Sequence, residues 1–367
     1  MPGMQVAVTL EQCWHAVPGG TAWSTLELVR ALDARDDVQL IGVAARHQDP
    51  PAEQWVPPIA VRQLPLPRNV LYETWHAPLL RWPRVERATG PIDVVHATAV
   101  AFPAAAAPIV VTIHDLAFLH DRQLATRHGH RFFRRGLELT RRHARLVMCP
   151  SQATMDECVE AGIESERLRL VPWGVTPTAV TDADRTRVLE RYGIDRPYVL
   201  FAGTVEPRKN LPRLLDAFTR LPDGTDLVLA GPAGWNESID DQIKTLGSRV
   251  RPLGFVGRAD LDVLLSGAKV FCYPSVREGF GLPVLEAMAQ GTPVVTSAAT
   301  STAEVAGDTA ILVDPLDVDA IASAIAELLD DPDEARRLGD AGRDRARSFT
   351  WQRTAELVVC VYREAVG

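Results

Sequence analysis

The chain has 367 residues, of which 46% are hydrophobic and 23% charged, and its formal net charge is −8. These values exclude a disordered or collagen-like chain, and a net acidic charge argues against general nucleic-acid binding. The five cysteines are scattered without a Cys-x-x-Cys pair, which argues against a disulfide framework or a zinc site. The length predicts about two domains.

Short apolar runs alternate with helical segments through the first half of the chain. We expect strands at 5–10, 38–44, 92–95, 109–113 and 146–149, a helix near 22–32, and a further helix that begins after the cap Ser151. The segment 94–113 is nearly apolar and long enough to span a membrane. Its prolines, and the His114-Asp115 pair that follows it, favour two buried strands instead.

The second half repeats the same alternation. We expect strands at 198–202, 227–230, 270–273 and 293–296, and helices near 211–221, 318–330, 333–349 and 351–366. This pattern predicts the α/β class, with two doubly wound parallel-sheet, Rossmann-like domains that face a central cleft. We expect domains at 1–178 and 179–350, and a C-terminal helix at 351–367 that crosses back to the first domain.

The strongest chemical signal is the run P-S-V-R-E-G-F-G-L-P-V-L-E-A at 274–287. Pro283 suits the first position of a helix, and the N-terminus of that helix would offer free N–H groups and a positive dipole to phosphate. Phosphate would repel Glu278 and Glu286, so we expect both carboxylates to accept hydrogen bonds from sugar hydroxyls. The alternative is a glycine-rich loop with surface glutamates.

The second signal is Arg208-Lys209-Asn210, which follows an expected strand and a Gly203-Thr204 turn. Two adjacent cations can neutralise a diphosphate leaving group. Lysine is rare here, with three in the whole chain, so its presence at this position is notable; the alternative is a solvated basic turn. We find no Asp-x-Asp motif after a strand in these regions, so we predict no metal ligands and a metal-independent reaction.

These motifs resemble those of the family 4 retaining glycosyltransferases with the GT-B fold, in particular a mannosyltransferase-like branch. E-G-F-G-L-P-V-L-E-A is similar to the family signature and G-T-V-E-P-R-K-N to its phosphate-binding segment. P-G-G, D-V-V-H and T-I-H-D-L fit in the N-terminal half. The resemblance spans nearly the whole chain.

The resemblance implies an enzyme of polysaccharide biosynthesis that moves a hexose, with mannose favoured, from a nucleotide diphosphate sugar to an acceptor hydroxyl. The acceptor would be a glycan, a glycolipid or a small molecule, and the product α-linked. GDP-mannose is the favoured donor, UDP- and dTDP-sugars stay open, and no other cofactor or nucleic-acid partner is implied. With no secretory signal visible, we expect a cytoplasmic protein, peripheral at the inner face of the membrane.

The resemblance also assigns residues. Arg208 and Lys209 would hold the donor diphosphate, Glu278 the donor sugar, Glu286 the ribose, and His114 would lie near the reacting carbon. Of these, we predict that His114, Glu278, Arg208 and Lys209 are catalytic. The remaining donor-binding positions are Gly19, Gly20, Gly203, Gly279, Phe280, Gly281 and Leu282.

Three further features have a structural and a functional interpretation. His96 ends a strand and could contact substrate, while Trp14 and His15 could line an acceptor pocket or belong to the core. Segment 121–145 holds eight Arg and three His with interleaved Phe132 and Phe133. It predicts an amphipathic helix whose basic face meets solvent, an anionic acceptor or lipid headgroups.

Rival functions remain open from the residues alone. An NAD-dependent oxidoreductase needs G-x-G-x-x-G after a strand, and here Gly279-Phe280-Gly281 is followed by Val284 at the third glycine position. A GT-B epimerase or phosphorylase, or a non-catalytic nucleotide-sugar-binding protein, would share much of the predicted site.

Overall fold

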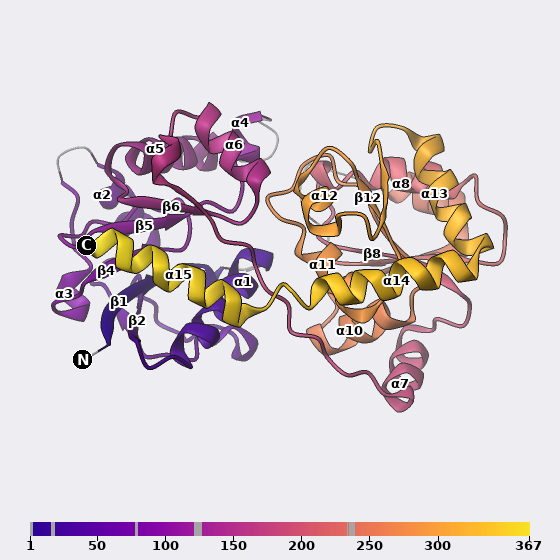
Figure 1. Cartoon of the computed structure of the whole chain (residues 1–367), viewed down its shortest axis with the longest axis horizontal. Helices are drawn as coiled ribbons and strands as arrows, with labels where there is room; N and C mark the ends of the chain where they lie inside the picture. The colour runs from indigo at the N-terminus through magenta and orange to yellow at the C-terminus, as the bar shows by residue number, and fades with distance from the viewer. Residues whose placement is uncertain (1–2, 16–18, 78–79, 121–126, 233, 235–238) are drawn as a thin grey trace. The chain divides into compact units, whose positions relative to one another are not determined.

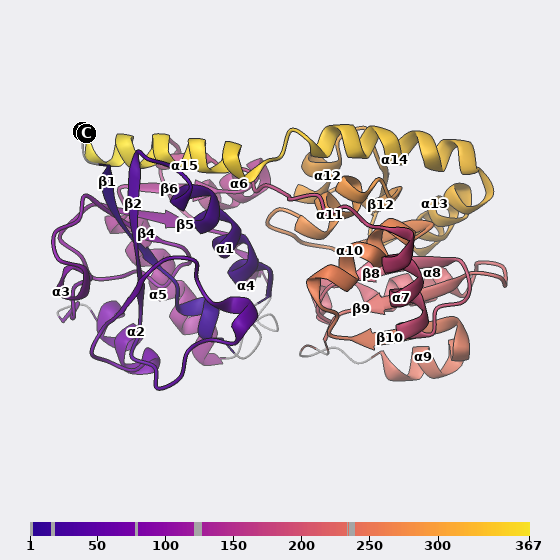
Figure 2. The ribbon, with the colours of Figure 1, turned by 90° about the horizontal axis from the view of Figure 1, so that it is seen from below.

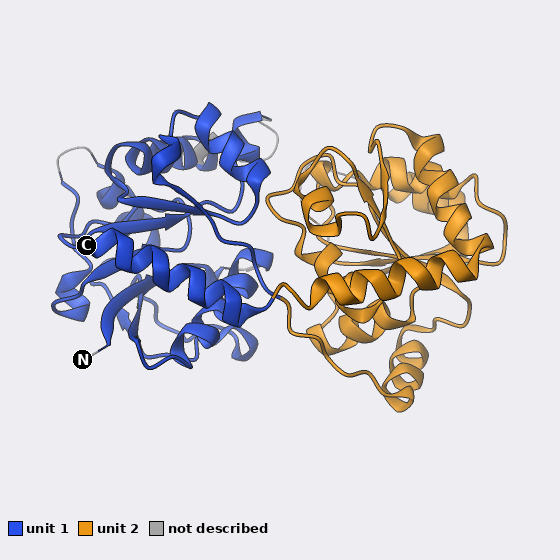
Figure 3. Cartoon of the chain, in the orientation of Figure 1, with its two compact units in different colours: residues 1–174, 350–367 blue, residues 175–349 orange. Residues whose placement is uncertain are grey.

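The computed structural model describes residues 3–15, 19–77, 80–120, 127–232, 234 and 239–367. The chain divides into two compact units (Figure 3). Unit 1 consists of Met1–Gly174 with Thr350–Gly367, and unit 2 of Val175–Phe349. Each unit contains its own parallel sheet with helices packed on it (Figure 1), which confirms the predicted α/β class and the two doubly wound sheets.

The sheet of unit 1 has the strand order β3-β2-β1-β4-β5-β6-β7. Its strands are β1 Met4–Thr9, β2 Val38–Ala44, β3 Val61–Gln63, β4 Val94–Ala97, β5 Ile109–Thr112, β6 Leu146–Cys149 and β7 Leu168–Leu170. Every residue of β4, β5 and β6 is buried, as expected for parallel strands covered on both faces. The apolar segment 94–113 is thus two strands and a connecting loop, as predicted.

Helices follow most strands of unit 1. They are α1 Gly19–Asp33, α2 Arg68–His76, α3 Glu86–Thr89, α4 Ala117–His120, α5 Arg127–His143, α6 Gln152–Glu160 and α15 Trp351–Val366, with 3₁₀ turns η1 Glu11–Trp14, η2 Glu53–Trp55 and η4 Ser165–Arg167. The Ser151 side chain accepts a hydrogen bond from the Thr154 N–H at 3.1 Å, which confirms it as the cap of α6.

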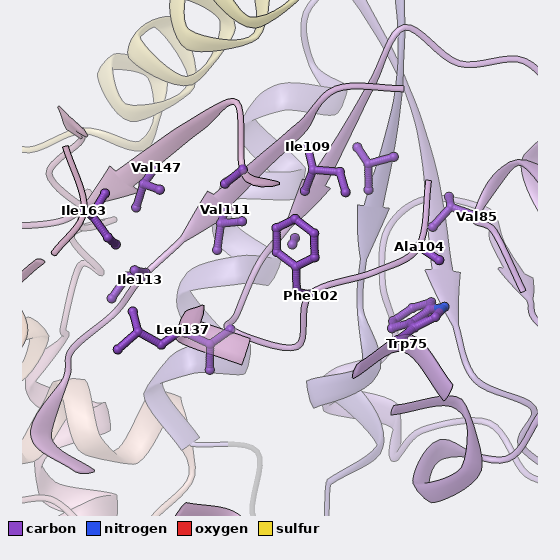
Figure 4. Packing of buried hydrophobic residues seen from close by; sticks show 14 of the residues in the cluster. Trp75, Val85, Phe102, Ala104, Ile109, Val111, Ile113, Leu137, Val147 and Ile163 are labelled. Carbon is purple, nitrogen blue, oxygen red and sulfur yellow. The ribbon is translucent and has the colours of Figure 1, made fainter. Parts of the chain in front are cut away.

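One face of the unit 1 sheet is covered by a large hydrophobic cluster. Figure 4 shows Val111 and Val147 of the sheet beside Phe102 of a connecting segment, Leu137 of α5 and Trp75 of α2. Their near-complete burial favours folding by about 1.5–3 kcal/mol for each large side chain. This face therefore fixes α2 and α5 against the strands.

Helix α15 covers the opposite face of the same sheet. Val95 belongs to the hydrophobic cluster, and because successive side chains of a strand alternate, its neighbour His96 points to the other face. There His96 Nδ1 lies 2.7 Å from the Tyr362 hydroxyl of α15. Figure 2 shows α15 alongside α1, and these two helices are in contact.

The sheet of unit 2 has the strand order β10-β9-β8-β11-β12-β13. Its strands are β8 Tyr198–Ala202, β9 Asp226–Ala230, β10 Val250–Gly254, β11 Val270–Tyr273, β12 Val294–Ser297 and β13 Ile311–Val313. Strands β8 and β11 are neighbours and parallel. Their carboxyl ends therefore lead into adjacent loops, and those loops are 203–210 and 274–281.

The helices of unit 2 fill the crossovers between these strands. They are α7 Asp182–Tyr192, α8 Leu211–Phe218, α9 Asp240–Leu246, α10 Arg258–Gly267, α11 Leu282–Gln290, α12 Ser301–Ala306, α13 Val318–Asp330 and α14 Pro332–Ala346, with 3₁₀ turns η5 Pro207–Lys209 and η6 Gly247–Arg249. Thr181 begins α7 with a capping box that includes Asp184.

Candidate active site

The predicted cation pair lies on η5, between β8 and α8 of unit 2. Lys209 is 7% exposed, and its Nζ donates to the Tyr273 hydroxyl at the end of β11. The Arg208 carbonyl accepts a hydrogen bond from the Val276 N–H at 2.9 Å, which ties this loop to the one after β11. The two loops named by the sequence motifs are therefore joined through both backbone and side chains.

Glu278 lies between the two cations. Its Oε2 accepts from Arg208 Nη1 at 2.8 Å, and its Oε1 from Lys209 Nζ at 2.6 Å. Burial alone would raise the pKa of Glu278, but the positive charges of Arg208 and Lys209 outweigh it and lower that pKa to about 2. Burial and the charge of Arg208 lower the pKa of Lys209, while Glu278 and Glu206 oppose that shift.

Glu206 is a member of this cluster that the motif analysis did not single out. It is 3% exposed, and its Oε1 lies 2.8 Å from Arg208 Nη2 and 4.0 Å from Lys209 Nζ. Two cations thus face two carboxylates, Glu206 and Glu278, which balances the charge of the cluster. The one sequence signal for Glu206 was its place inside G-T-V-E-P-R-K-N, ahead of Pro207.

Asn210 holds the turn that follows the cations. Its φ is +61°, a left-handed conformation that asparagine tolerates better than most residues. Its side-chain amide donates to the Pro274 carbonyl at 2.9 Å and the Pro315 carbonyl at 2.6 Å. Asn210 therefore connects the loops that follow β8, β11 and β13.

Glycines allow two loops of this site to approach each other closely. A Cβ placed on Gly231, after β9, would come within 1.9 Å of the Gly203 carbonyl oxygen, after β8. A side chain at Gly231 would therefore push the two strand ends apart. Gly203 keeps the position predicted for it, at the entrance to the cation loop.

The predicted phosphate-binding helix is α11. Gly281 precedes it with φ +102°, and a Cβ there would come within 2.7 Å of the Thr302 side chain. Leu282 begins the helix, and Pro283 is its second residue, one position later than predicted but still in the first turn, where proline is tolerated. The Phe280 side chain is 5% exposed and contacts the ring of Phe349 edge-on, with centroids 6.1 Å apart, so it packs within unit 2.

Glu286 points from α11 toward α10, where Arg258 binds it. Arg258 Nη1 donates to Glu286 Oε1, and Arg258 Nη2 lies 3.3 Å from Asp262 Oδ1. Burial raises the pKa of Glu286, and the Arg258 charge opposes that shift. The sequence did not indicate this partner, because Arg258 lies 28 positions away in a different helix.

Unit 1 contains the predicted residues His114, Gly19 and Gly20. His114 follows β5, is half-buried and packs against Trp173 with ring centroids 5.6 Å apart. Its Nε2 lies 2.8 Å from the Thr98 carbonyl oxygen. Because a carbonyl can only accept, Nε2 carries the proton and the neutral ring keeps Nδ1 as an acceptor. Burial lowers the pKa of His114, so the ring is neutral near neutral pH.

Gly19 and Gly20 begin α1 and are exposed. Gly19 has φ +63°, and a Cβ at either glycine would meet no atom within 4 Å. The first turn of α1 contains no acidic residue, so its positive dipole is not offset locally. Pro18 of the P-G-G motif lies outside the described residues.

His96 belongs to the core of unit 1, and the idea that it contacts substrate is wrong. The ring is fully buried, with Nδ1 2.7 Å from the Tyr362 hydroxyl and Nε2 2.8 Å from the Thr112 hydroxyl. Burial lowers the pKa of His96 to about 3. The ring is therefore a neutral, fully hydrogen-bonded connection between β4, β5 and α15.

The basic segment 121–145 forms α5 from Arg127 onward, and residues 121–126 lie outside the described part. Phe132 stacks on Tyr72 and His76, with ring centroids 5.1 and 4.5 Å apart, and Leu137 enters the hydrophobic cluster. Arg131 and Arg134 are exposed. The predicted amphipathic helix is confirmed, and its basic face is turned to solvent.

Among the described residues, no group of three or more His, Cys, Asp or Glu side chains is arranged to hold a metal ion. Nor does any helix described here combine the length and apolar character that crossing a bilayer requires.

Two family models match the chain. The model described as Glycosyltransferase Family 4 matches residues 18–179, and Glycosyl transferases group 1 matches residues 184–345. The chain is 34% identical to the Escherichia coli O-antigen chain mannosyltransferase B over 69% of its own length and 70% of that relative. It is 34% identical to the Mycolicibacterium hassiacum MMP alpha-(1->4)-mannosyltransferase over 71% of its length and 66% of that relative.

A longer match and a solved structure extend the comparison. The D-inositol 3-phosphate glycosyltransferase of Xylanimonas cellulosilytica is 31% identical over 97% of this chain and 94% of that protein. The crystal structure of Anabaena HepE in complex with UDP and glucose has a TM-score of 0.77 at 20% identity, covering 98% of this chain and 100% of that one. Fold, motifs and matches agree: the chain belongs to the family 4 glycosyltransferases of the GT-B fold. It is a glycosyltransferase, which sets aside the oxidoreductase alternative.

Proposed function

We propose that this enzyme transfers a hexose, with mannose favoured, from a nucleotide diphosphate sugar to an acceptor hydroxyl, with retention at the anomeric carbon. The observation that carries the proposal is the cation pair Arg208 and Lys209. Both side chains donate hydrogen bonds to the Glu278 carboxylate, which lies shortly before the start of α11. The mannosyltransferase names of two relatives support mannose and hence GDP-mannose; UDP- and dTDP-sugars are the alternatives to be tested. The acceptor class is a glycan, a glycolipid or a small molecule.

The leaving group is stabilised by fixed positive charge. In the proposed complex the donor diphosphate takes hydrogen bonds from Arg208 and Lys209 and from backbone N–H groups at the start of α11. Glu278 then turns from the cations to hydroxyls of the donor sugar, while Glu206 continues to hold Arg208. As the bond from sugar to phosphate breaks, the developing negative charge meets two cations that are already in place.

The proposal of retention is supported by the resemblance to retaining glycosyltransferases and by the residues around His114. An inverting enzyme needs a general base on the face opposite the leaving group. His114, with its unprotonated Nδ1, could act as such a base, so the resemblance to retaining enzymes decides against inversion. A retaining enzyme could use a carboxylate nucleophile instead. The neighbouring Asp115 carboxylate accepts a hydrogen bond from the Ala117 N–H at 3.0 Å, so it is engaged with its own loop and does not suit the role of nucleophile. We therefore propose front-face attack, in which the departing diphosphate takes the acceptor proton and His114 binds a donor-sugar hydroxyl.

Unit 1 supplies the acceptor side in this proposal. The exposed arginines of α5, Arg131 and Arg134, would attract anionic lipid headgroups and hold a cytoplasmic enzyme at the inner face of the membrane. Co-sedimentation with anionic vesicles tests this part: replacing both arginines by glutamine should reduce the bound fraction, and an unchanged fraction would remove the membrane role of α5.

One experiment tests the function as a whole. The purified chain is incubated with GDP-mannose, UDP-glucose or a dTDP-sugar, each with its anomeric carbon ¹³C-labelled, and NMR follows transfer to acceptors or slow transfer to water. We expect GDP-mannose to be consumed fastest and any transfer product to show the anomeric coupling of an α-linkage. A β-linked product from an α-linked donor would refute retention, and no turnover of any donor would refute the proposal.

A further inference from the structure

One arginine and two histidine side chains lie at one edge of the unit 1 sheet. His15 follows η1, which comes directly after β1, and His47 lies three residues after the end of β2. Strands β1 and β2 pair in parallel, with Thr9 opposite Val43, so their carboxyl ends meet at the same edge. Arg68 begins α2. Ligands of doubly wound sheets bind outside this edge.

His47 is fixed by two contacts. Glu11 is 4% exposed, and its Oε2 accepts from the Ala45 N–H at 2.8 Å and lies 3.1 Å from His47 Nε2. The Trp14 ring stacks on the His47 ring with centroids 4.7 Å apart and planes 11° apart. A buried carboxylate and an aromatic ring thus hold the His47 ring in place, and that aromatic residue, Trp14, directly precedes His15 in the chain.

Arg68 and His15 are exposed and, among the described residues, neither side chain has a carboxylate partner. Arg68 is also the first residue of a nine-residue helix, where the helix dipole disfavours a positive charge. The position therefore costs stability in the free protein. An arginine kept there without a protein partner suits a ligand that carries negative charge.

The strand ends place these groups at one edge of the sheet, and their charges act on one another. Although the His15 side chain is exposed, the protein packed around it and the charges of Arg68 and His47 lower the pKa of its imidazole. Tyr72 lies one turn after Arg68, and charges of both signs affect the pKa of its hydroxyl. Burial and the Glu11 charge raise the pKa of Tyr72, and the Arg68 charge opposes them.

We propose that Arg68 and His15, backed by the fixed His47, form an anion subsite that binds a phosphate monoester on the acceptor. This inference rests on the proposed function, because it names the acceptor class for the same reaction. Arg68 supplies a permanent, forked donor for the phosphate oxygens. His15 takes up a proton when the anion arrives and adds a second charge-assisted hydrogen bond. The phosphate belongs either to a small polyol or sugar phosphate or to a lipid headgroup.

Sulfate, which stays doubly charged across the pH range of histidine titration, is the first probe. The chain is labelled with ¹³C at histidine Cε1, His15 is assigned with His15→Gln, and its pKa is measured in sulfate and in chloride of equal ionic strength. We expect sulfate to raise the His15 pKa in the wild type and in Arg62→Gln, the matched control for an exposed unit 1 arginine. We expect no such rise in Arg68→Gln, and an equal rise there would overturn the subsite.

Phosphate esters then identify the source of the anion. Glycerol 3-phosphate should bind and glycerol should not, with affinity falling about tenfold or more in Arg68→Gln, as expected for a lost charge-assisted bond. Binding instead to phosphatidic acid vesicles, with the same loss in Arg68→Gln, would assign the phosphate to a lipid headgroup. If neither glycerol 3-phosphate nor the vesicles bind, the proposal is wrong.

The donor site gives an independent control. The affinity for the nucleoside diphosphate should be the same in Arg68→Gln as in the wild type, and an equal loss there would show that Arg68 serves the donor and overturn the acceptor assignment. If the wild type binds no nucleoside diphosphate, the proposed function fails. The sulfate titration still tests the anion subsite in that case.

Discussion

The Nζ of Lys209 lies 2.6 Å from Oε1 of Glu278, and both side chains are more than nine-tenths buried. Each charge stabilises the other in a place where either alone would be costly. The same two groups are expected to separate when the donor binds, because one should hold phosphate and the other a sugar hydroxyl. The ion pair of the free site is therefore a closed form that the donor must open.

Removing Glu278 should separate binding from turnover. In Glu278→Gln both cations lose a carboxylate that competes with the diphosphate, so we expect affinity for the nucleoside diphosphate to hold or improve while turnover falls. Losing one partner of a buried ion pair costs about 3–5 kcal/mol, so the melting temperature should drop as well. Calorimetric titration and a donor-turnover assay measure both effects; weaker diphosphate binding would contradict the closed-pair account.

Glu286 and Arg258 should act together on the nucleotide. Glu286→Ala removes the proposed ribose acceptor and Arg258→Ala removes the charge that opposes protonation of Glu286, so both should weaken nucleotide binding. The Arg258→Ala defect should also grow as the pH falls, because burial then raises the pKa of Glu286 without opposition. Titrations with the ribo- and 2′,3′-dideoxynucleotides check this: if Glu286→Ala loses no affinity for the ribonucleotide, the ribose assignment is wrong.

Arg208 and Lys209 should each be needed for the departure of the diphosphate. By analogy with removing one oxyanion donor, Arg208→Gln or Lys209→Met should lower turnover by about 10²–10³, or about 2.7–4 kcal/mol. Lys244→Met is the matched control, because Lys244 is an exposed lysine of unit 2 paired with Asp241 on α9. Donor hydrolysis rates measure the effect, and equal losses in all three variants would point to general destabilisation.

His96 should make the stability of unit 1 depend on pH. Its pKa is about 3 in the folded chain and near 6.5 when unfolded, so the unfolded state binds more protons between these values. Its contribution to stability is complete above about pH 6.5 and falls by up to about 1.4 kcal/mol per pH unit below it. The free energy of unfolding, measured by urea unfolding at several pH values in this range, should depend less steeply on pH in His96→Gln than in the wild type. An identical pH dependence would mean that His96 is not the group that titrates.

Turnover should survive removal of divalent metal. The leaving-group account assigns the charge stabilisation to Arg208 and Lys209, so donor consumption in excess EDTA should match that in buffer alone. If EDTA abolishes activity and magnesium or manganese restores it, a metal ion shares the role given to those two residues.

The buried strands were predictable from the sequence, and the edge strands were not. Strands β6, β8 and β11 begin and end at the predicted residues, because central parallel strands are continuous apolar runs. Strands β3, β7 and β13 have three residues each and lie at or near a sheet edge with part of their surface exposed. Their apolar signal is too short to distinguish from a loop.

The sequence motifs predicted which residues belong to the candidate site, but not which residues form ion pairs with them. Arg208, Lys209, Glu278 and Glu286 were found because local loop and helix chemistry identifies them. Arg258 was missed, since its ion pair with Glu286 joins two separate helices and leaves no periodic pattern in the chain. Glu206 was missed although it lies two residues before Arg208 in the same loop. His96 was misinterpreted for the related reason that a strand-end histidine gives no sign of which face it points to.

The place of α15 has a consequence for how the protein is made. Unit 2 is one uninterrupted stretch of chain, so a ribosome delivers it whole, whereas unit 1 cannot bury His96 until Tyr362 has been synthesised. The domain begun first is therefore completed last, and the sheet face beneath α15 stays open to solvent while unit 2 forms. A stop or frameshift shortly after residue 349 would spare the residues proposed to hold the donor and leave unit 1, which carries His114 and the proposed anion subsite, without its covering helix.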